Sequence, residues 1–269
     1  MRVDLAGRVA WITGAGQGIG RGIALGLAAA GADIVVNDLA SGPGGDNPAA
    51  YETAQLVRAL GRQARVSYAD VAEAEQVEAV VADAVAVFGR LDIAVANAAF
   101  SVRELVVASA WPDVERTIAV TQFGVFHTCR AAARRMIAQG HGGKIVIIGS
   151  IMADMALPMS AAYNMAKAAV NQFGRTLAEE LAPHRINVNV VNPGYIDTPG
   201  ERRFADEAAI ARAGRAIPWG RIGTPADIGH AVTFLCSEAA DYITGSALRV
   251  DGGFLGGLRL PPAPETEGQ

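Results

Sequence analysis

The chain has 269 residues, 51% of them hydrophobic, and carries 23 Lys and Arg against 27 Asp and Glu, a formal net charge of −4. This length is enough for one large α/β domain with a substantial core. The slightly negative charge provides no attraction for nucleic acid or an anionic membrane surface. No apolar run approaches a membrane span, and the first residues lack the apolar core of a signal peptide, so we expect a cytoplasmic protein. Cys129 and Cys236 form neither a disulfide framework nor a metal-ligand spacing, and we expect no metal site.

Strand and helix patterns alternate along the chain. Seven strands are predicted, at 8–13, 33–38, 63–68, 91–96, 144–148, 186–191 and 244–251. Helices are predicted at 21–30, from about 48 to 60 after a Gly- and Pro-rich loop at 40–48, and at 73–88, 113–139, 161–181 and 225–237. Short connections between alternating elements imply right-handed crossovers and a parallel sheet. The predicted fold class is therefore α/β, a single-domain Rossmann-type doubly wound parallel sheet of about seven strands flanked by helices.

The domain is predicted to cover residues 1–259. Residues 199–223 are polar, rich in Arg and the least regular part, which is typical of a lid over a pocket. Residues 260–269 have the composition of a flexible tail.

Glycines follow the first predicted strand in the run Thr13-Gly-Ala-Gly-Gln-Gly-Ile-Gly20. At a strand–helix junction glycines allow a tight turn and a close approach of backbone to phosphate, while the helix N-terminus supplies N–H groups and the positive end of its dipole. The spacing Gly14-x-x-x-Gly18-x-Gly20 differs from the common G-x-G-x-x-G. Taken alone, the cluster fits a bare turn as well as a dinucleotide site.

An acidic residue ends the second predicted strand. Asp38 can accept hydrogen bonds from the ribose hydroxyls of an adenine dinucleotide, and it would repel a 2′-phosphate. Neither Gln17 nor Leu39 is a basic residue that would attract that phosphate. The pattern favours NAD over NADP, with a loop-capping Asp as the alternative. Asp70, after the third strand, either faces the adenine edge or caps the next helix.

A tyrosine and a lysine share one face of a predicted helix. Tyr163 and Lys167 lie about one turn apart, so the phenol and the ammonium group project from the same side. A free tyrosine, with a pKa of about 10, is a poor base at neutral pH. A lysine one turn away favours the phenolate and is expected to lower that pKa. Ser150 follows a predicted buried strand directly, at the edge where open α/β sheets place their ligands.

Taken together, these features resemble the classical, NAD(P)-dependent branch of the short-chain dehydrogenase/reductase family over roughly residues 5–255. Each motif alone is weak, and all of them in family order over one array of strands and helices are highly specific. The matching motifs are Thr13-Gly14-x3-Gly18-x-Gly20, Asp38, Asp70-Val71, Asn97-Ala98, Ser150, Tyr163-x3-Lys167, and Asn192-Pro193-Gly194 with Thr198.

The resemblance implies a division of roles. Tyr163 would be the general acid–base, Lys167 would bind the nicotinamide ribose and lower the pKa of the tyrosine, and Ser150 would hold the reacting oxygen. Hydride transfer would belong to the cofactor, NAD, while the protein orients it and manages the proton. The implied cofactor-binding residues are Gly14, Gln17, Gly18, Ile19, Gly20, Asp38, Leu39, Asp70, Val71, Asn97, Ala98, Tyr163, Lys167, Pro193, Gly194, Ile196 and Thr198.

The chain departs from the family pattern at three places. Ala96-Asn97-Ala98-Ala99 replaces the usual Asn-Asn-Ala-Gly, and Gly149 takes a place that often holds a second serine. Thr121 lies where the family commonly has an asparagine whose carbonyl holds a water of the proton relay. A threonine hydroxyl can hydrogen-bond back to its own helix instead of reshaping it. Because the relay can use the same carbonyl, we still expect activity.

The leading hypothesis is an NAD-dependent oxidoreductase that interconverts a secondary alcohol and a ketone, or a cyclic hemiacetal of a sugar and a lactone. The pocket would be lined by residues 100–103, 151–159, Tyr195 and the lid. Its methionines would suit a cyclic alcohol, ketone or steroid-like substrate. Charged residues around the lid would recognise a sugar, polyol or sugar acid if they turn inward, and otherwise form a solvated surface: Arg103, Glu201, Arg202 and Arg203.

Two alternatives belong to other classes. A reductase of the 3-oxoacyl-carrier-protein type would prefer NADPH, against which Asp38 weighs. A non-catalytic homologue that only binds the dinucleotide is supported by Thr121 alone. The family also implies a homotetramer, formed through the long helices after the fourth and fifth strands and through the C-terminal strand region.

Overall fold

The computed structural model describes residues 3–40 and 45–255. Part of the predicted loop at 40–48, the predicted tail at 260–269 and the predicted end of the domain at residue 259 lie outside the described residues. Within the described ranges, no helix is both long and apolar enough to cross a bilayer.

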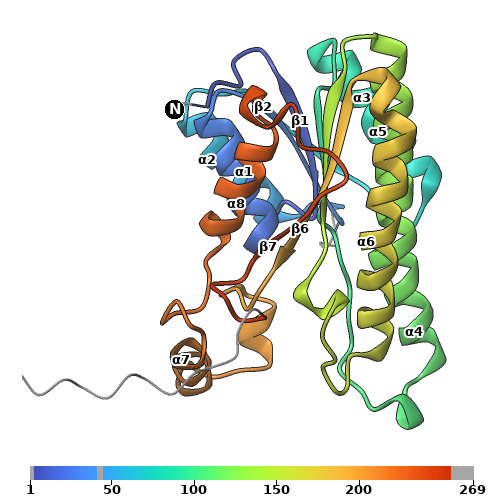
Figure 1. Cartoon of the computed structure of the whole chain (residues 1–269). Helices are drawn as coiled ribbons and strands as arrows, with labels where there is room; N and C mark the ends of the chain where they lie inside the picture. Colours follow the sequence, from blue (N-terminus) through green and yellow to red (C-terminus); the bar gives the residue numbers. More distant parts are fainter. Residues whose placement is uncertain (1–2, 41–44, 256–269) are drawn as a thin grey trace, which may run out of the picture.

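Seven parallel strands form one sheet (Figure 1). They are β1 (Val9–Thr13), β2 (Asp33–Asp38), β3 (Ala64–Tyr68), β4 (Ile93–Ala96), β5 (Gly143–Ile148), β6 (Ile186–Pro193) and β7 (Ala247–Val250). Their order across the sheet is β3-β2-β1-β4-β5-β6-β7. The strand order changes direction between β1 and β4. Doubly wound sheets bind their ligands in the crevice at this point. The predicted fold class is confirmed.

Helices cover both faces of the sheet (Figure 1). One face carries α1 (Gly18–Ala29), α2 (Pro48–Ala59) and α8 (Pro225–Leu235), and the other carries α3 (Ala74–Phe88), α5 (Gly124–Gln139) and α6 (Ala161–Leu181). Each layer has its own hydrophobic cluster against the sheet. Because both faces are buried, the central strands β1 and β4 are continuous apolar runs instead of alternating ones.

The start of α8 shows how the local sequence determines where a helix begins. Thr224 caps the helix by accepting from the backbone N–H of Asp227, and the Asp227 carboxylate accepts in return from the Thr224 backbone N–H. Pro225 occupies the first turn, where its missing N–H costs nothing. The predicted cap is confirmed, although the helix ends two residues earlier than predicted.

The predicted helical segment at 113–139 is helical throughout but changes its hydrogen-bond pattern in the middle. It consists of α4 (Trp111–Ile118), a π-helical turn at Ala119–Phe123 and α5. The predicted irregular lid also contains a helix, α7 (Glu207–Ala216), which Asp206 caps by accepting from the backbone N–H of Ala209.

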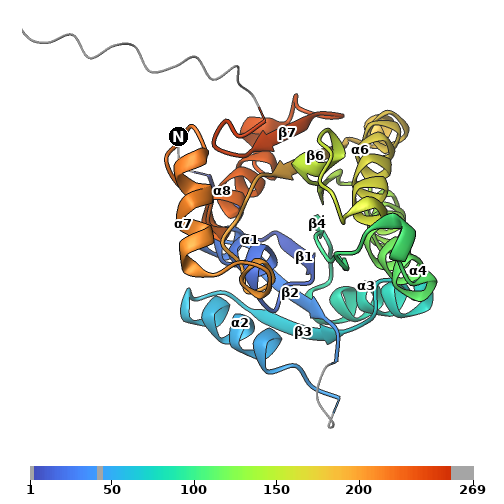
Figure 2. The ribbon, with the colours of Figure 1, turned by 90° about the horizontal axis from the view of Figure 1, so that it is seen from below.

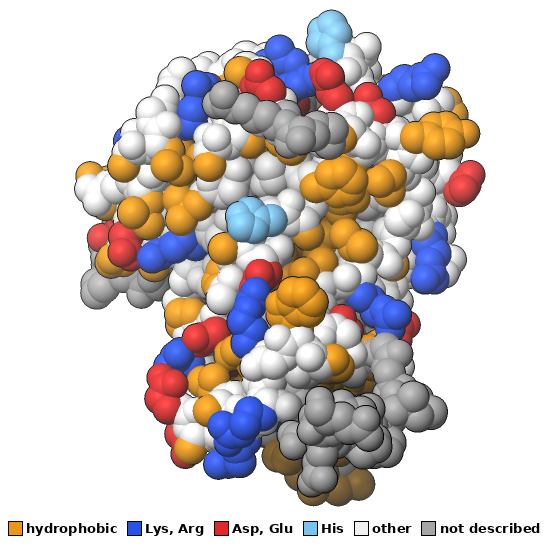
Figure 3. All heavy atoms as spheres, turned by 60° about the vertical axis from the view of Figure 1, so that its left-hand side comes forward, with side chains coloured by type: hydrophobic (Ala, Val, Ile, Leu, Met, Phe, Trp, Pro, Cys, Tyr) orange, Lys and Arg blue, Asp and Glu red, His pale blue; other side chains and the backbone are white. Residues whose placement is uncertain are grey.

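The lid lies at the carboxyl end of the strands. Figure 2 looks onto this end, with α7 on one side of the strand ends and α4 and α6 on the other. On the face shown in Figure 3, basic and acidic side chains are intermixed instead of gathered by sign.

Candidate active site

Two adjoining cavities open at the carboxyl end of the sheet. One, of about 320 Å³, runs past the glycine turn and the ends of β2 and β3. The other, of about 490 Å³, lies between β5, α6 and the lid. Both are lined by Asn97, Phe100 and Thr198, so they form one continuous cleft. The first is called the dinucleotide groove below, and the second the reaction pocket.

The glycine turn leaves no room for side chains. Gly14 and Gly18 have φ of +63° and +55°, a left-handed conformation that favours glycine. A Cβ on Gly20 would lie 2.1 Å from the carbonyl oxygen of Gly14. The backbone itself therefore forms the wall of the groove at the N-terminus of α1, as a site for a pyrophosphate requires.

Asp38 is fixed at the end of β2 by two backbone N–H groups. Its Oδ2 accepts from Gly16 N at 2.7 Å, and its Oδ1 accepts from Leu39 N at 2.8 Å. A carboxylate oxygen accepts more than one hydrogen bond, so both oxygens retain capacity for the hydroxyls of a ribose. Together with the glycine turn, this donor and acceptor set fits an adenine dinucleotide.

Most of the predicted cofactor residues meet in the two cavities. Those lining the dinucleotide groove are Gly14, Gln17, Gly18, Ile19, Asp38, Leu39, Asp70, Val71, Asn97, Ala98 and Thr198. Those lining the reaction pocket are Ile19, Asn97, Tyr163, Lys167, Pro193, Gly194, Ile196 and Thr198. Gly20 is buried and lines neither cavity, and it serves instead the close packing of the turn against Asn97.

Of the two alternatives for Asp70, the structure favours the groove. Helix α3 begins at Ala74 with Glu73 as its N-cap residue, so Asp70 does not cap it. The Asp70 carboxylate pairs with Arg116 at 2.8 Å and accepts from Ala72 N. Arg116 also lines the groove, and no motif in the sequence points to it.

Ser150, Tyr163 and Lys167 line the reaction pocket together. The Ser150 hydroxyl accepts from Met152 N at 3.1 Å, which leaves its own proton free for the Tyr163 phenol. Lys167 Nζ lies 5.4 Å from the centroid of the Tyr163 ring, so the two side chains share one helix face as predicted. Tyr163 and Lys167 come from the first two turns of α6, and Ser150 from the end of β5.

Lys167 is almost wholly buried, and its ammonium group donates to the carbonyl of Ile148 at 2.7 Å. Burial disfavours the charged form and lowers the pKa of Lys167 to about 7.

The Tyr163 phenol does not have the lowered pKa that the sequence predicts. Burial raises its pKa to about 12, the hydrogen bond from Ser150 acts in the opposite direction, and the negative charge of Glu201 adds to the rise. The prediction considered the charge of a nearby lysine and neglected the cost of removing a phenolate from water. Because burial also lowers the pKa of Lys167, that positive charge is itself weakened near neutral pH.

Thr121 lies in the π-helical turn, and its hydroxyl bonds outside its own helix. Oγ1 donates to Phe100 O at 2.8 Å and accepts from Phe100 N at 2.9 Å. It does not bond back to its own helix, as a threonine can, because Phe100 offers both a donor and an acceptor. Thr121 thus attaches the helix to the loop after β4, which lines both cavities.

Some contributors were missed by sequence reasoning. Asn192 Oδ1 accepts from Ser150 N at 2.9 Å and so fixes the backbone of the predicted catalytic serine. A Cβ on Gly149 would lie 2.0 Å from that oxygen, which explains the glycine next to Ser150. Phe254, beyond the last strand, also lines the reaction pocket. Asn192 stands in the quoted Asn-Pro-Gly motif, and nothing in the local sequence signals Phe254.

The charged residues around the lid divide into two sets. Arg103 and Glu201 line the reaction pocket and form an ion pair at 3.0 Å. Arg202 pairs with Asp197 and Glu207 within the lid, and Arg203 is exposed.

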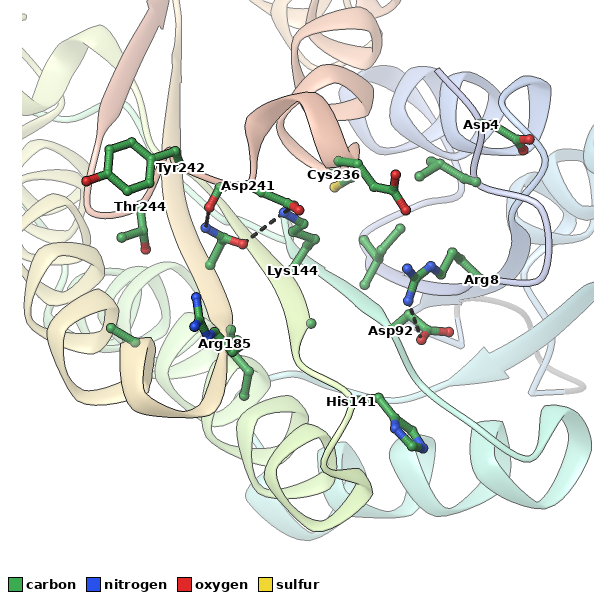
Figure 4. Close-up of a pocket in the computed structure, with 17 residues that line it drawn as sticks. Asp4, Arg8, Asp92, His141, Lys144, Arg185, Cys236, Asp241, Tyr242 and Thr244 are labelled. Atoms are coloured by element: carbon green, nitrogen blue, oxygen red, sulfur yellow. Dashed lines mark hydrogen bonds and ion pairs between the residues drawn. The ribbon is translucent and has the colours of Figure 1, made fainter. Parts of the chain in front are cut away.

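A further cavity, of about 520 Å³, lies at the opposite end of the sheet (Figure 4). Two ion pairs lie along it, Arg8 with Asp92 and Lys144 with Asp241. Among the described residues, no cluster of three or more His, Cys, Asp or Glu could hold a metal ion.

Comparison with known proteins agrees with this geometry. Residues 14–255 match the family model described as enoyl-(acyl carrier protein) reductase. The 2-dehydro-3-deoxy-D-gluconate 5-dehydrogenase of Escherichia coli is 38% identical over 94% of this chain and 97% of its own. A short-chain type dehydrogenase/reductase from Mycobacterium marinum superposes with a TM-score of 0.88, at 34% identity over 94% of this chain and 98% of the other.

The chain belongs to the short-chain dehydrogenase/reductase family. The names of two further relatives mention NADP, one of them together with NAD. An L-rhamnose 1-dehydrogenase (NAD(P)(+)) from Sphingomonas is 37% identical over 93% of this chain and 96% of its own. A structure from Agrobacterium tumefaciens with bound NADP has a TM-score of 0.84 at 35% identity, over 94% of this chain and 98% of the other. Membership supports an oxidoreductase of a family that uses a nicotinamide dinucleotide, and the relatives named here act on small molecules.

Proposed function

We propose that this short-chain dehydrogenase/reductase oxidises a secondary alcohol of a sugar-like or polyol substrate to a ketone, or a sugar hemiacetal to a lactone, with NAD as its cofactor. The observation that carries the proposal is the single cleft in which Ser150, Tyr163 and Lys167 face one cavity and Asp38 lines the adjoining one. The names of relatives that act on sugar acids and L-rhamnose support the substrate class.

The residues of this chain have separable tasks. Tyr163, as phenolate, takes the proton of the substrate hydroxyl, and as phenol it returns a proton in the reverse direction. Ser150 donates a hydrogen bond to the reacting oxygen, and Lys167 contributes positive charge beside the phenolate. The bound nicotinamide supplies the hydride acceptor or donor. The glycine turn would hold the pyrophosphate, and Asp38 would accept from the adenosine ribose.

Replacement of Tyr163 by Phe tests the mechanism. We expect turnover to fall by about 10²–10⁴-fold, because the proton loses its acceptor, while NADH binding, followed by fluorescence, stays within threefold. Retained turnover in Y163F would refute the role of the phenol. Loss of both turnover and NADH binding would point to misfolding, which circular dichroism distinguishes.

Replacement of Asp38 by Ser tests the cofactor preference. Since the Asp38 carboxylate repels a 2′-phosphate, we expect kcat/KM for NAD to exceed that for NADP in the parent enzyme. In D38S we expect the ratio of the two constants to shift toward NADP by about tenfold or more, equivalent to about 1.4 kcal/mol. Equal use of both cofactors by the parent chain would contradict the assignment.

The remaining alternatives are weaker. The family model's description includes acyl-carrier-protein reductases, but Asp38 stands against the NADPH that such an enzyme would use. A non-catalytic role rests only on Thr121 in place of the usual asparagine, and the presence of Ser150, Tyr163 and Lys167 in one pocket weighs against it. The homotetramer and the cytoplasmic location stay predictions.

A further inference from the structure

One cation and one anion face each other at the rim of the reaction pocket. Arg103 comes from the loop after β4, and Glu201 from the short helical turn Glu201–Arg203 of the lid. Arg103 Nη2 lies 3.0 Å from Glu201 Oε2, and the two side chains are 31% and 30% exposed. Both line the pocket that holds Ser150 and Tyr163.

The Arg103 guanidinium has N–H donors that are not used in hydrogen bonds within the described residues. A guanidinium carries five N–H donors in a planar fork that matches a carboxylate. Within residues 3–40 and 45–255, Glu201 accepts the only hydrogen bond that the Arg103 side chain donates. The ring of Phe204 lies 4.1 Å from the guanidinium carbon, so one face of the fork is supported while its edge stays available.

The other cations near the pocket are committed elsewhere. The Lys167 ammonium is buried on the carbonyl of Ile148. Arg202 is held between Asp197 and Glu207, away from the pocket lining. Arg103 is thus the cationic side chain in this part of the structure that can meet a substrate anion without first losing a buried partner.

From this arrangement we infer that Arg103 selects substrates that carry a carboxylate, which takes the place of Glu201 on the guanidinium. The exchange is feasible because Glu201 is partly exposed and can be hydrated when released. An incoming carboxylate can accept two parallel N–H bonds where Glu201 accepts one, and bidentate charge-assisted pairs are the stronger kind. Tyr195 lines the same rim and offers a further hydroxyl donor. A neutral polyol would gain nothing from this exchange.

This inference rests on the proposed function and narrows its substrate class to hydroxy acids. Substrates would bind with the carboxylate at Arg103 and the reacting hydroxyl at Ser150 and Tyr163. Glu201 then acts as an internal substitute for the substrate anion and keeps the guanidinium oriented between turnovers.

Matched probes test the inference by binding as well as by turnover. Gluconate is compared with glucitol, and 3-hydroxybutyrate with 2-butanol, by calorimetric titration into the chain saturated with NADH and by kcat/KM with NAD. We expect at least one acid to bind more tightly than its neutral counterpart. In R103Q the affinity and kcat/KM for that acid should fall by about 10- to 100-fold, the effect of losing a charged hydrogen-bonding partner.

Three variants serve as controls. R203Q removes an exposed lid arginine that does not line the pocket and should leave every constant within threefold. R103K keeps the charge without the fork and should lose less than R103Q. E201Q removes the competing anion and should strengthen binding of the acid.

The possible results distinguish a failure of this inference from a failure of the proposed function. Failure of both acids to bind the parent chain, or equal losses in R103Q for acids and neutral alcohols, would overturn the inference. Binding of an acid that depends on Arg103 without any NAD reduction would uphold the inference and refute the proposed oxidation instead.

Discussion

At the scale of single residues, Lys167 combines a buried position with a titratable charge. Its ammonium group donates to the Ile148 carbonyl and lies over the Tyr163 ring, and no carboxylate of the described residues pairs with it. Burial of this charge lowers the stability of the folded chain, at a position where the amine lines the reaction pocket. A stability cost located at a site residue is typical of a functional constraint.

We predict that the stability of the parent chain relative to K167M rises with pH between about 7 and 10. The folded-state pKa of Lys167, about 7, lies below that of the unfolded chain, so the unfolded chain binds more protons in this window. The stability contributed by this group is full only above the unfolded pKa and is lost as pH falls toward 7. The expected rise is about 3 kcal/mol, measured by urea unfolding of both proteins.

The upper limit of this window is the pKa of a lysine in the unfolded chain, about 10.4. Tyr163 is present in both proteins, so its raised pKa, about 12, makes the stability of both fall with pH above pH 10 and cancels in the difference. A difference between parent and K167M that stays constant from pH 7 to 10 would contradict the assignment of a buried, easily neutralised amine.

At the scale of elements, the π-helical turn between α4 and α5 and the loop after β4 depend on one another. The wider turn places Thr121 against Phe100, where one hydroxyl satisfies both backbone groups of that residue. Phe100 lines both cavities, so the shape of the cleft is tied to the geometry of a π-turn that the sequence does not predict.

Replacement of Thr121 by Val should loosen this attachment. Val keeps the shape and removes both hydrogen bonds, which leaves the N–H and C=O of Phe100 without their partner. We expect the free energy of unfolding to fall by about 1–3 kcal/mol and KM to rise more than kcat falls, because the loop and not the reacting groups is disturbed. T121S keeps the hydroxyl and should resemble the parent chain. Equal stability of T121V and T121S would show that the attachment contributes nothing.

At the scale of the whole molecule, the fold followed from local patterns, because β2 and α6 have the bounds that their apolar periodicity predicts. The site followed because parallel strands bring the segments after β1, β2 and β5 to one edge, whatever their separation in sequence. Features that depend on contacts between distant parts of the chain could not be predicted from the sequence. The pKa of Tyr163 depends on burial, and the π-turn depends on Phe100. Helix α7 was missed for a different reason, because its local N-cap, Asp206, lies within an otherwise polar segment.

The same whole-molecule view bears on assembly. Phe123, Phe126 and Phe173 line a hollow of about 460 Å³ between α5 and α6, and the side chains of Phe123 and Phe126 are 51% and 45% exposed. An apolar hollow on the long helices is typical of a surface that packs against another copy. It coincides with the helices through which the predicted tetramer would form.

We predict that F126E dissociates the assembly to a lower-order species, because a carboxylate would be desolvated in an apolar contact at a cost of several kcal/mol. Light scattering coupled to size-exclusion chromatography measures the mass of parent and variant. V107D places a charge on an apolar side chain that is 95% exposed but lies on the short helical turn Val106–Ala108, away from this hollow, and should leave the mass unchanged. A parent chain that is already monomeric, or an F126E variant of unchanged mass, would rule out this face as the contact, and the exposed phenylalanines would then need another partner to cover them.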